Sequence, residues 1–192
     1  MRIKRFLRWS RRLLFVTGIF ALGFVGFTLL EARLYQVSAK RVLASRIQIQ
    51  RAGAVTLPRV AINEGDVVGR MDIPRLGVSV AILQGTNRRM LRLGVGHIEG
   101  TPLPGEVGNS GIAGHRDTFF RALKDLRRDD QIEVQTPTGM FRYRVDWVKV
   151  VASDDHSVLA PSTEPALTLV TCYPFYFVGP APRRFVVRAH QY

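Results

Sequence analysis

Cysteine is the scarcest reactive side chain in this 192-residue chain, because only Cys172 is present. A lone cysteine excludes an intrachain disulfide, so the fold must be stabilised by the packing of its core. Outside a reducing compartment, a single thiol is either buried as a small apolar side chain or kept for its reactivity. The position of Cys172 in the chain therefore has to decide between these two interpretations.

Acidic residues are absent from residues 1–12, which carry six basic side chains. Residues 31–50 add four basic residues and one acidic residue, and 18 basic and 14 acidic residues remain from position 51 onward. The net charge of +13 thus comes mainly from the first 50 residues. No basic helix and no aromatic surface interleaved with basic residues accompanies this charge, so we expect no nucleic-acid partner.

The sequence also lacks internal repeats, low-complexity tracts and closely spaced metal ligands. His97, His115 and Cys172 could in principle hold zinc, but they are separate residues without the paired spacing of a zinc site. Asp154 and Asp155 do not belong to a calcium-loop pattern. We therefore expect neither a metal nor a cofactor.

One long uncharged run, LLFVTGIFALGFVGFTLL, extends from Leu13 to Leu30. Its 18 residues at about 1.5 Å each span roughly 27 Å, close to the thickness of a bilayer core. The run predicts a transmembrane helix. A cleavable signal peptide is the second interpretation, because charged residues separate the nearest small-residue site, Val37-Ser38-Ala39, from the run. The basic residues 1–12 predict a cytoplasmic N-terminus, with the bulk of the chain outside.

Residues 31–64 are predicted to form a juxtamembrane helix followed by a linker. Apolar residues at mixed helical spacing continue to Gln50, and Gly and Pro interrupt the pattern from Arg51 to Glu64, where we place the domain boundary. The helix either contacts anionic lipid or serves as a solvated spacer. Residues 65–192 are expected to fold as one domain, and a chain starting near Ala52 is expected to be soluble.

Short period-two runs replace helical spacing from Asp66 onward. About eight such runs without a βαβ rhythm predict a mostly β fold, either a barrel or a sandwich. In the run 141–151, alternation is expected to turn one face inward, from Phe141 to Trp147. Asn87, and either Asp117 or Thr118, are expected to cap two short helices. The predicted elements are hairpins at 66–83 and 131–151, helices at 87–93 and 118–126, and a long loop at 94–109.

The lone cysteine lies at the end of a predicted strand. A period-two run begins at Leu167, reaches Cys172 and stops at Tyr173-Pro174, and a second run begins at Arg184. If the two strands pair antiparallel, Cys172 and Arg184 flank the same loop, which brings a thiol close to a guanidinium group. Alternation sends Arg183 and Arg184 to opposite faces, so we expect Arg184 to face the thiol and Arg183 to face solvent.

A thiol that attacks a carbonyl near neutral pH needs a base, or an imidazolium partner that lowers its pKa. Of the four histidines, His156 lies in a polar loop and His190 lies two residues from the C-terminus. His115 ends the run SGIAGH and precedes a charged turn, a placement that matches Cys172. His97, flanked by Gly and Pro residues, is expected to line a cleft without transferring protons.

Three separated motifs, GNSGIAGHRDTFF, TLVTCYP and RRFVV, resemble those of the sortase family, and the CYPF sequence is most similar to class D. The resemblance covers roughly residues 66–189. It implies a closed eight-stranded β-barrel with short helices, preceded here by the transmembrane helix. It also implies that His115 is the catalytic histidine, Cys172 the nucleophile and Arg184 the catalytic arginine. Thr171 matches the threonine before the cysteine.

The function implied by this resemblance is that of a membrane-anchored cysteine transpeptidase. Such an enzyme cleaves an LPxTG-like sorting signal through a thioacyl intermediate and transfers the protein to an amine, on a cell-wall precursor or a pilin lysine. Thr171, His97 and Tyr173 are expected to bind substrate, with packing as an open alternative for Thr171 and Tyr173. Two other functions stay open: a non-catalytic tethered surface module, and a transpeptidase of peptidoglycan stems, whose SHGC-type signature is absent.

Overall fold

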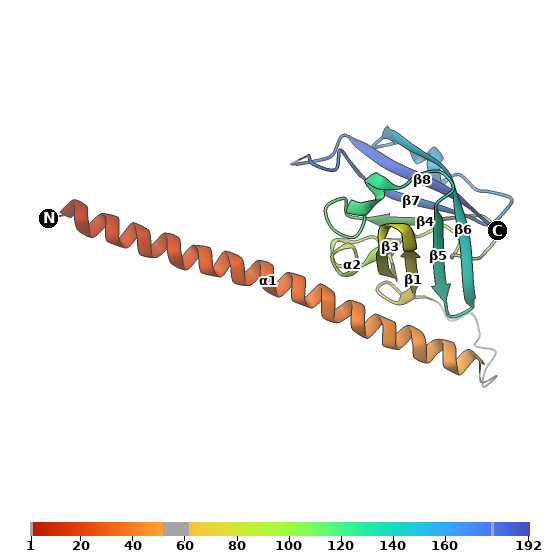
Figure 1. Cartoon of the computed structure of the whole chain (residues 1–192), viewed down its shortest axis with the longest axis horizontal. Helices are drawn as coiled ribbons and strands as arrows, with labels where there is room; N and C mark the ends of the chain where they lie inside the picture. The colour runs from red at the N-terminus through yellow and green to blue at the C-terminus, as the bar shows by residue number, and fades with distance from the viewer. Residues whose placement is uncertain (1, 52–61, 178) are drawn as a thin grey trace.

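The computed structural model describes residues 2–51, 62–177 and 179–192, and it places a long helix beside a closed β-barrel (Figure 1). The helix, α1, spans Arg2–Arg51, and its N-terminal part extends away from the barrel. The predicted linker and domain boundary at 51–64 fall largely on residues outside this description.

Short strands, one further α-helix and three 3-10 helices make up the barrel domain. In chain order they are β1 (Val67–Ile73), η1 (Pro74–Leu76), β2 (Val78–Gln84), α2 (Arg88–Leu93), β3 (Val95–His97), β4 (Asn109–Gly114), η2 (Arg121–Asp125), β5 (Gln131–Thr136), β6 (Gly139–Ala152), η3 (His156–Leu159), β7 (Ala166–Tyr173) and β8 (Arg183–Gln191).

The eight strands close in the order β1-β2-β3-β4-β7-β8-β6-β5. The pairs β2–β3 and β4–β7 are parallel, and the other neighbouring strands pair antiparallel. The prediction of a closed, mostly antiparallel, eight-stranded barrel is therefore confirmed. Because β4 and β7 run in the same direction side by side, their carboxyl ends meet at one edge of the barrel.

Inward-facing apolar side chains of all the strands form the main core. On β6, Tyr143 and Val145 are buried as the alternation predicts. A bulge between Val145 and Trp147 then shifts the register, so that Val148 packs against the core while Trp147 pairs with Arg188. The predicted inward position of Trp147 is wrong, because an extra residue in a bulge reverses the alternation that follows it.

The short helices only partly match the sequence prediction. Asn87 caps α2, its side chain accepting a hydrogen bond from the Met90 amide at 2.9 Å. The predicted helix at 118–126 is instead the 3-10 helix η2, and its N-cap residue, Phe120, makes no side-chain capping bond. Phe120 is fully buried, so core packing takes the place of the predicted cap. The predicted loop at 94–109 contains the short strand β3.

The C-terminal half of α1 packs onto the barrel, and its buried residues form a second core with β1, β2 and α2, here called the helix–barrel cluster. Its members are Ala39, Leu43, Val67, Ala81, Leu83, Met90 and Leu93. Gln36 fastens the contact at both ends of its amide: Nε2 donates to Leu93 O at 2.6 Å, and Oε1 accepts from Ala81 N at 2.9 Å. The interpretation of this helix as a solvated spacer is therefore wrong. A chain starting near Ala52 would lack Ala39 and Leu43 and would expose their apolar partners on the barrel, and its expected solubility stays a prediction.

Between Arg8 and Leu30, where the side chains of α1 are described, no residue belongs to either core. One stretch of the helix is long and apolar enough to cross a membrane, with a mean hydropathy of 2.3 and none of its most apolar window buried. Its large side chains, Phe20 and Leu22 among them, are exposed. This apolar helix is consistent with anchoring by a single membrane span.

Candidate active site

Three neighbouring strands carry His115, Cys172 and Arg184 to the same level. The parallel ladder of β4 and β7 ends at the pair Gly114 and Thr171, so His115 and Cys172 follow at the next position. The antiparallel ladder of β7 and β8 sets Arg184 directly opposite Cys172. The structure thus brings the three predicted residues together in one row, here called the open row, at the edge where β4 and β7 end.

The open row lies on the outer face of the barrel. Leu169 and Phe185 belong to the inward-facing core, and strand alternation therefore turns Cys172 and Arg184 outward. Cys172 is half-buried, and His115 and Arg184 are also partly exposed. A substrate can reach all three without unfolding any strand.

Most polar groups of the open row make no hydrogen bond to the described part of the protein. Among the described residues, neither the Cys172 thiol nor the His115 ring has a hydrogen-bond partner. Arg184 Nη1 donates to the backbone oxygens of Ala181 and Arg183, at 3.2 and 3.1 Å. These bonds orient the guanidinium and leave its other N–H groups available. A thiol, an imidazole and a permanent cation with free donors form a set suited to acyl transfer.

Arg183 does not belong to this row. It pairs with Tyr173, alternation places it on the face of β8 opposite to that of Arg184, and its position at the start of the strand leaves it exposed. His156 and His190 also lie away from the open row. His190 pairs with Asp146 at 2.5 Å, and His156 begins η3.

Thr171 precedes the cysteine, but its hydroxyl is engaged in a buried hydrogen bond within the protein. Its Oγ1 donates to Gly114 O at 2.7 Å, and the bond is buried. A Cβ atom at Gly114 would lie 2.6 Å from the Phe120 ring, so this position accommodates only glycine without a shift. The end of β4, and with it His115, is therefore held between Thr171 and Phe120.

His97 ends β3 and is only 2% exposed. Its Nδ1 lies 2.9 Å from Gln84 Oε1, and its Nε2 lies 2.9 Å from Pro102 O and 3.1 Å from Thr101 Oγ1. Burial lowers the pKa of this histidine. Protein groups engage both ring nitrogens, so His97 holds the turn after β3. Neither ring nitrogen is free for a substrate.

The aromatic residues after the cysteine divide into two groups. Tyr173 stacks on Phe185 with ring centroids 6.5 Å apart, and Phe175 meets the same ring at 5.1 Å. These rings pack against the core. Tyr176 and Phe177, in contrast, are 72% and 44% exposed. The structure therefore packs Tyr173 and Phe175 against the core and leaves Tyr176 and Phe177 exposed.

Arg116 is a contact residue that the sequence does not reveal. Its Nη2 donates to Phe177 O at 2.7 Å and to Gly179 O at 3.0 Å, and its guanidinium lies 5.8 Å from the centre of the Phe177 ring. Arg116 therefore ties the loop after Cys172 to the residue that follows His115. An arginine in a charged turn gives no sequence signal for a contact across 61 positions.

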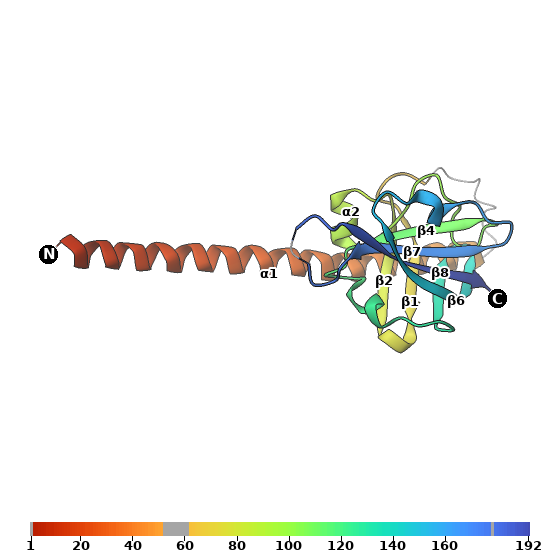
Figure 2. The same cartoon turned by 90° about the horizontal axis from the view of Figure 1, so that it is seen from above.

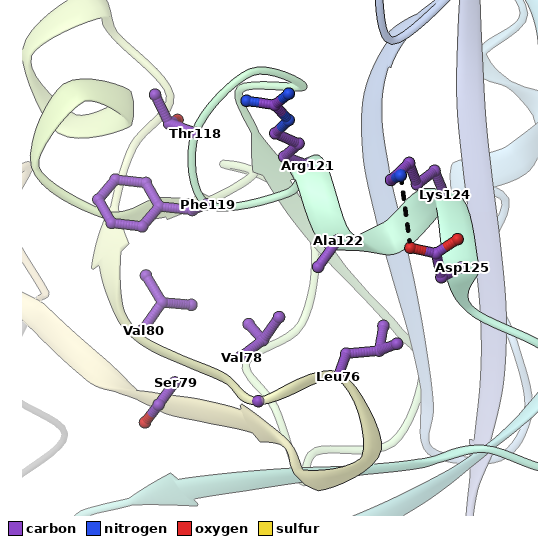
Figure 3. A pocket seen from close by; sticks show the side chains of 11 residues that line it. Leu76, Val78, Ser79, Val80, Thr118, Phe119, Arg121, Ala122, Lys124 and Asp125 are labelled. Carbon is purple, nitrogen blue, oxygen red and sulfur yellow. Dashed lines mark ion pairs between the residues drawn. The ribbon is translucent and has the colours of Figure 1, made fainter.

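A pocket of about 440 Å³ on the described surface does not include the open row. It lies between the start of β2 and the segment from Thr118 to Asp125, with Val78, Val80 and Phe119 on its apolar side and Arg121 and Lys124 at its rim (Figure 3). Lys124 pairs with Asp125 at 3.6 Å. The open row therefore lies outside this pocket, although Thr118 at its wall follows His115 by three residues in the sequence.

A second row crosses the same face of the same strands, four positions earlier on β7, and is here called the covered row. It consists of Gly111, Thr168 and Arg188. Arg188 Nη1 donates to Thr168 Oγ1 at 3.2 Å, and Thr168 Oγ1 donates to Asn109 Oδ1 at 2.7 Å. Asn109 Nδ2 donates to Val158 O and Ala160 O, both at 3.1 Å. The η3 segment therefore covers this row and uses its polar atoms.

Within the residues that the structure describes, no group of three or more His, Cys, Asp or Glu side chains is arranged to hold a metal ion.

Comparison with known proteins gives the same family for sequence and fold. The sortase domain model matches residues 71–192. Sortase D of Bacillus subtilis (strain 168) is 32% identical over 180 residues, which cover 88% of this chain and 91% of that protein. A solved Clostridium perfringens sortase D5 transpeptidase superposes with a TM-score of 0.69 at 27% identity, covering 82% of this chain and 98% of its own. Clostridium perfringens sortase C, solved with the C-terminal cell wall sorting motif, has a TM-score of 0.64 at 30% identity and covers 80% and 87%.

Proposed function

The chain belongs to the sortase family of transpeptidases, and from this premise we propose that it cleaves an LPxTG-like sorting signal and transfers the signal-bearing protein to an amine. The proposal rests on the open row, in which three adjacent strands bring together Cys172, His115 and Arg184. The polar groups of these side chains are largely free of hydrogen bonds to the described residues. The solved structure of the similar sortase C with the C-terminal cell wall sorting motif supports the substrate class.

In the first half of the proposed reaction, Cys172 Sγ attacks the carbonyl carbon of the scissile peptide bond. The C–N bond breaks, the acyl group stays on sulfur as a thioester, and the departing amine takes a proton from the His115 imidazolium. In the second half, the acceptor amine attacks the thioester carbon and gives a proton to His115. A new amide forms, and the thiolate of Cys172 is released.

Arg184 is proposed to stabilise the oxyanion that forms in both halves, or to hold the substrate backbone. Two hydrogen bonds fix its guanidinium to the backbone of Ala181 and Arg183, and Arg184 is the ladder partner of Cys172. A guanidinium suits this task because it stays charged and presents several donors in a fixed plane.

Thr171 is proposed to act by position rather than by contact, because its hydroxyl holds the strand end that carries His115. The predicted contacts of His97 and Tyr173 with substrate stay predictions. The buried ring of His97 and the stacking of Tyr173 on Phe185 support packing roles for both residues.

We propose that α1 anchors the enzyme in the cell membrane with its N-terminus in the cytoplasm and the barrel outside. The six basic residues among the first 12, against an uncharged run at 13–30, support this orientation. An external barrel fits a sorting-signal-bearing surface protein as substrate and an amine of a cell-wall precursor or a pilin lysine as acceptor.

The test is a peptide library with LPxTG-like motifs, incubated with the full-length chain and with glycine- or lysine-terminated amines. Mass spectrometry is expected to find ligated products whose cleavage point lies within the motif. The matched Cys172→Ala chain is expected to give none. Ligation that survives this substitution, or the absence of cleavage for every motif and amine, would contradict the proposed function.

A further inference from the structure

The docking of α1 fixes which side of the barrel faces the membrane. The apolar run ends at Leu30, and Gln36, which bonds the backbone of α2 and β2, follows six residues later, roughly 9 Å along the helix. At the end of the run, Glu31 pairs with Arg92 of α2 at 3.7 Å. The barrel is therefore held beside the end of the span, with α2 on the side of the bilayer.

The loop between β7 and β8 extends further in the same direction. In both views it is the part of the barrel domain that reaches furthest toward the N-terminal end of α1 (Figures 1 and 2). The turn between β5 and β6 lies on the opposite side, near the C-terminal end of α1 (Figure 1). If residues 13–30 cross a bilayer, this loop points at its surface.

The described residues of this loop present exposed aromatic rings beside cations. Arg121 and Lys124 lie 5.9 and 5.8 Å from the centre of the Tyr176 ring, and Arg116 lies over Phe177. The neighbouring Lys124 ammonium lowers the pKa of Tyr176. Asp125 offsets part of this charge through its contact with Lys124.

The α2 helix adds positive charge on the same side. Arg88, Arg89 and Arg92 are exposed, and the helix contains no acidic residue. Aromatic rings with one wet edge and basic side chains are the residues that gather at the headgroup level of membranes.

We propose that the β7–β8 loop, through Tyr176 and Phe177, and the arginines of α2 lie against the anionic headgroups of the bilayer that α1 spans. This surface is here called the membrane-facing surface, and the inference rests on the membrane anchoring proposed above. Because β7 ends at Tyr173, one residue after Cys172, contact of the loop with lipid holds the open row at a fixed height above the bilayer.

The single native cysteine makes a depth measurement possible. In a full-length Cys172→Ala chain, a nitroxide is attached at Tyr176→Cys and, as the matched control, at Met140→Cys, an exposed position at the start of β6. The chains are reconstituted in vesicles of phosphatidylglycerol and phosphatidylethanolamine. Accessibility to oxygen and to a water-soluble nickel chelate is then measured by electron paramagnetic resonance.

The label at position 176 is expected to be several-fold less accessible to the nickel chelate than the label at 140, and more accessible to oxygen. Adding Arg88→Glu and Arg89→Glu is expected to raise nickel accessibility at 176. Equal accessibility at 176 and 140 would overturn the inference.

A third label, at Leu22→Cys, separates this inference from the anchoring on which it rests. A deep label at 22 with a fully aqueous label at 176 would overturn the membrane-facing surface alone. An aqueous label at 22 would overturn the anchoring as well.

Discussion

The open row and the covered row occupy the same three strands, face the same side and each contain an arginine of β8, yet their side chains are used differently. In the covered row, Arg188 bonds Thr168, which bonds Asn109 in turn, and burial lowers the pKa of Arg188. In the open row, the thiol of Cys172 and the ring of His115 have no hydrogen-bond partner among the described residues.

The difference comes from what lies over each end of the sheet. Carbonyl groups next to η3 accept bonds from Asn109 and close the covered row. At the other end, Arg116 bonds carbonyl groups of the β7–β8 loop, and the open row stays accessible. Strand position and residue type alone do not separate Arg184 from Arg188, whereas the use of their donors does.

Among these changes, we expect the largest loss of rate when the proton-transfer group of the open row is removed. His115→Ala should reduce the rate of transpeptidation by roughly a hundredfold to ten-thousandfold, since that is the usual contribution of a general acid or base. The thiol should still accept a small methanethiosulfonate label. The rates are measured by product mass spectrometry at saturating peptide.

His190→Ala serves as the control, because His190 is exposed and paired with Asp146 on another pair of strands. Its turnover should stay near that of the unmodified chain. An equal loss at both histidines would remove the special role of His115.

The second effect compares two neighbouring arginines. Arg184→Lys should lower the rate of turnover by about a hundredfold to a thousandfold, the usual cost of losing an oxyanion donor, because an ammonium cannot replace a planar donor with several N–H groups. Arg183→Ala should leave turnover nearly unchanged, since Arg183 faces solvent. If kinetics show the reverse order, the catalytic assignment belongs to Arg183.

The third effect breaks the covered row and should act on stability rather than chemistry. Thr168→Val removes the bonds of Arg188 Nη1 and Asn109 Oδ1 to the Thr168 hydroxyl, and a buried group left unsatisfied costs about 1–3 kcal/mol. Denaturant unfolding should show this loss, while turnover per folded molecule stays close to normal. The matched Thr163→Val change, at an exposed position, should have little effect. A selective loss of turnover at Thr168 would assign the covered row to the reaction.

The smallest effect concerns pH. Burial lowers the pKa of His97 in the folded chain, whereas its unfolded value is about 6.5. Below pH of about 6.5 the unfolded state therefore binds more protons, and stability should fall as pH falls toward the folded pKa. His97→Gln should flatten this dependence in unfolding measurements between about pH 5 and 7. An unchanged profile together with a raised KM would favour the substrate contact predicted from the sequence.

Local patterns in the sequence predict a mostly β fold but leave barrel and sandwich open, whereas the resemblance of three motifs to the sortase family implies the closed barrel and the residues of the open row. Period-two runs mark the strands, and the motifs around His115 and Cys172 lie at strand ends whose pairing follows from the fold. The bulge before Trp147 and the bond from Arg116 to the β7–β8 loop leave no such pattern, because partners distant in the chain determine them.

The packing of α1 on the barrel is the feature that the sequence pattern predicts least well. Ala39 and Leu43 are buried although their surroundings are basic, because one narrow stripe of the helix meets α2 and the β1–β2 hairpin. Helical spacing shows that the stripe exists, but only the folded chain shows what it covers.

Trapping the acyl intermediate tests whether the open row is a reactive centre with Cys172 as its nucleophile. The full-length chain is incubated with a cleavable sorting-signal peptide without an amine acceptor, quenched in acid and examined by intact-mass and peptide mass spectrometry. We expect a mass increase equal to the acyl group of the amino-terminal fragment of the peptide, located on Cys172 and absent from Cys172→Ala. Cleavage without an adduct in both chains, or an adduct on another residue, would contradict it.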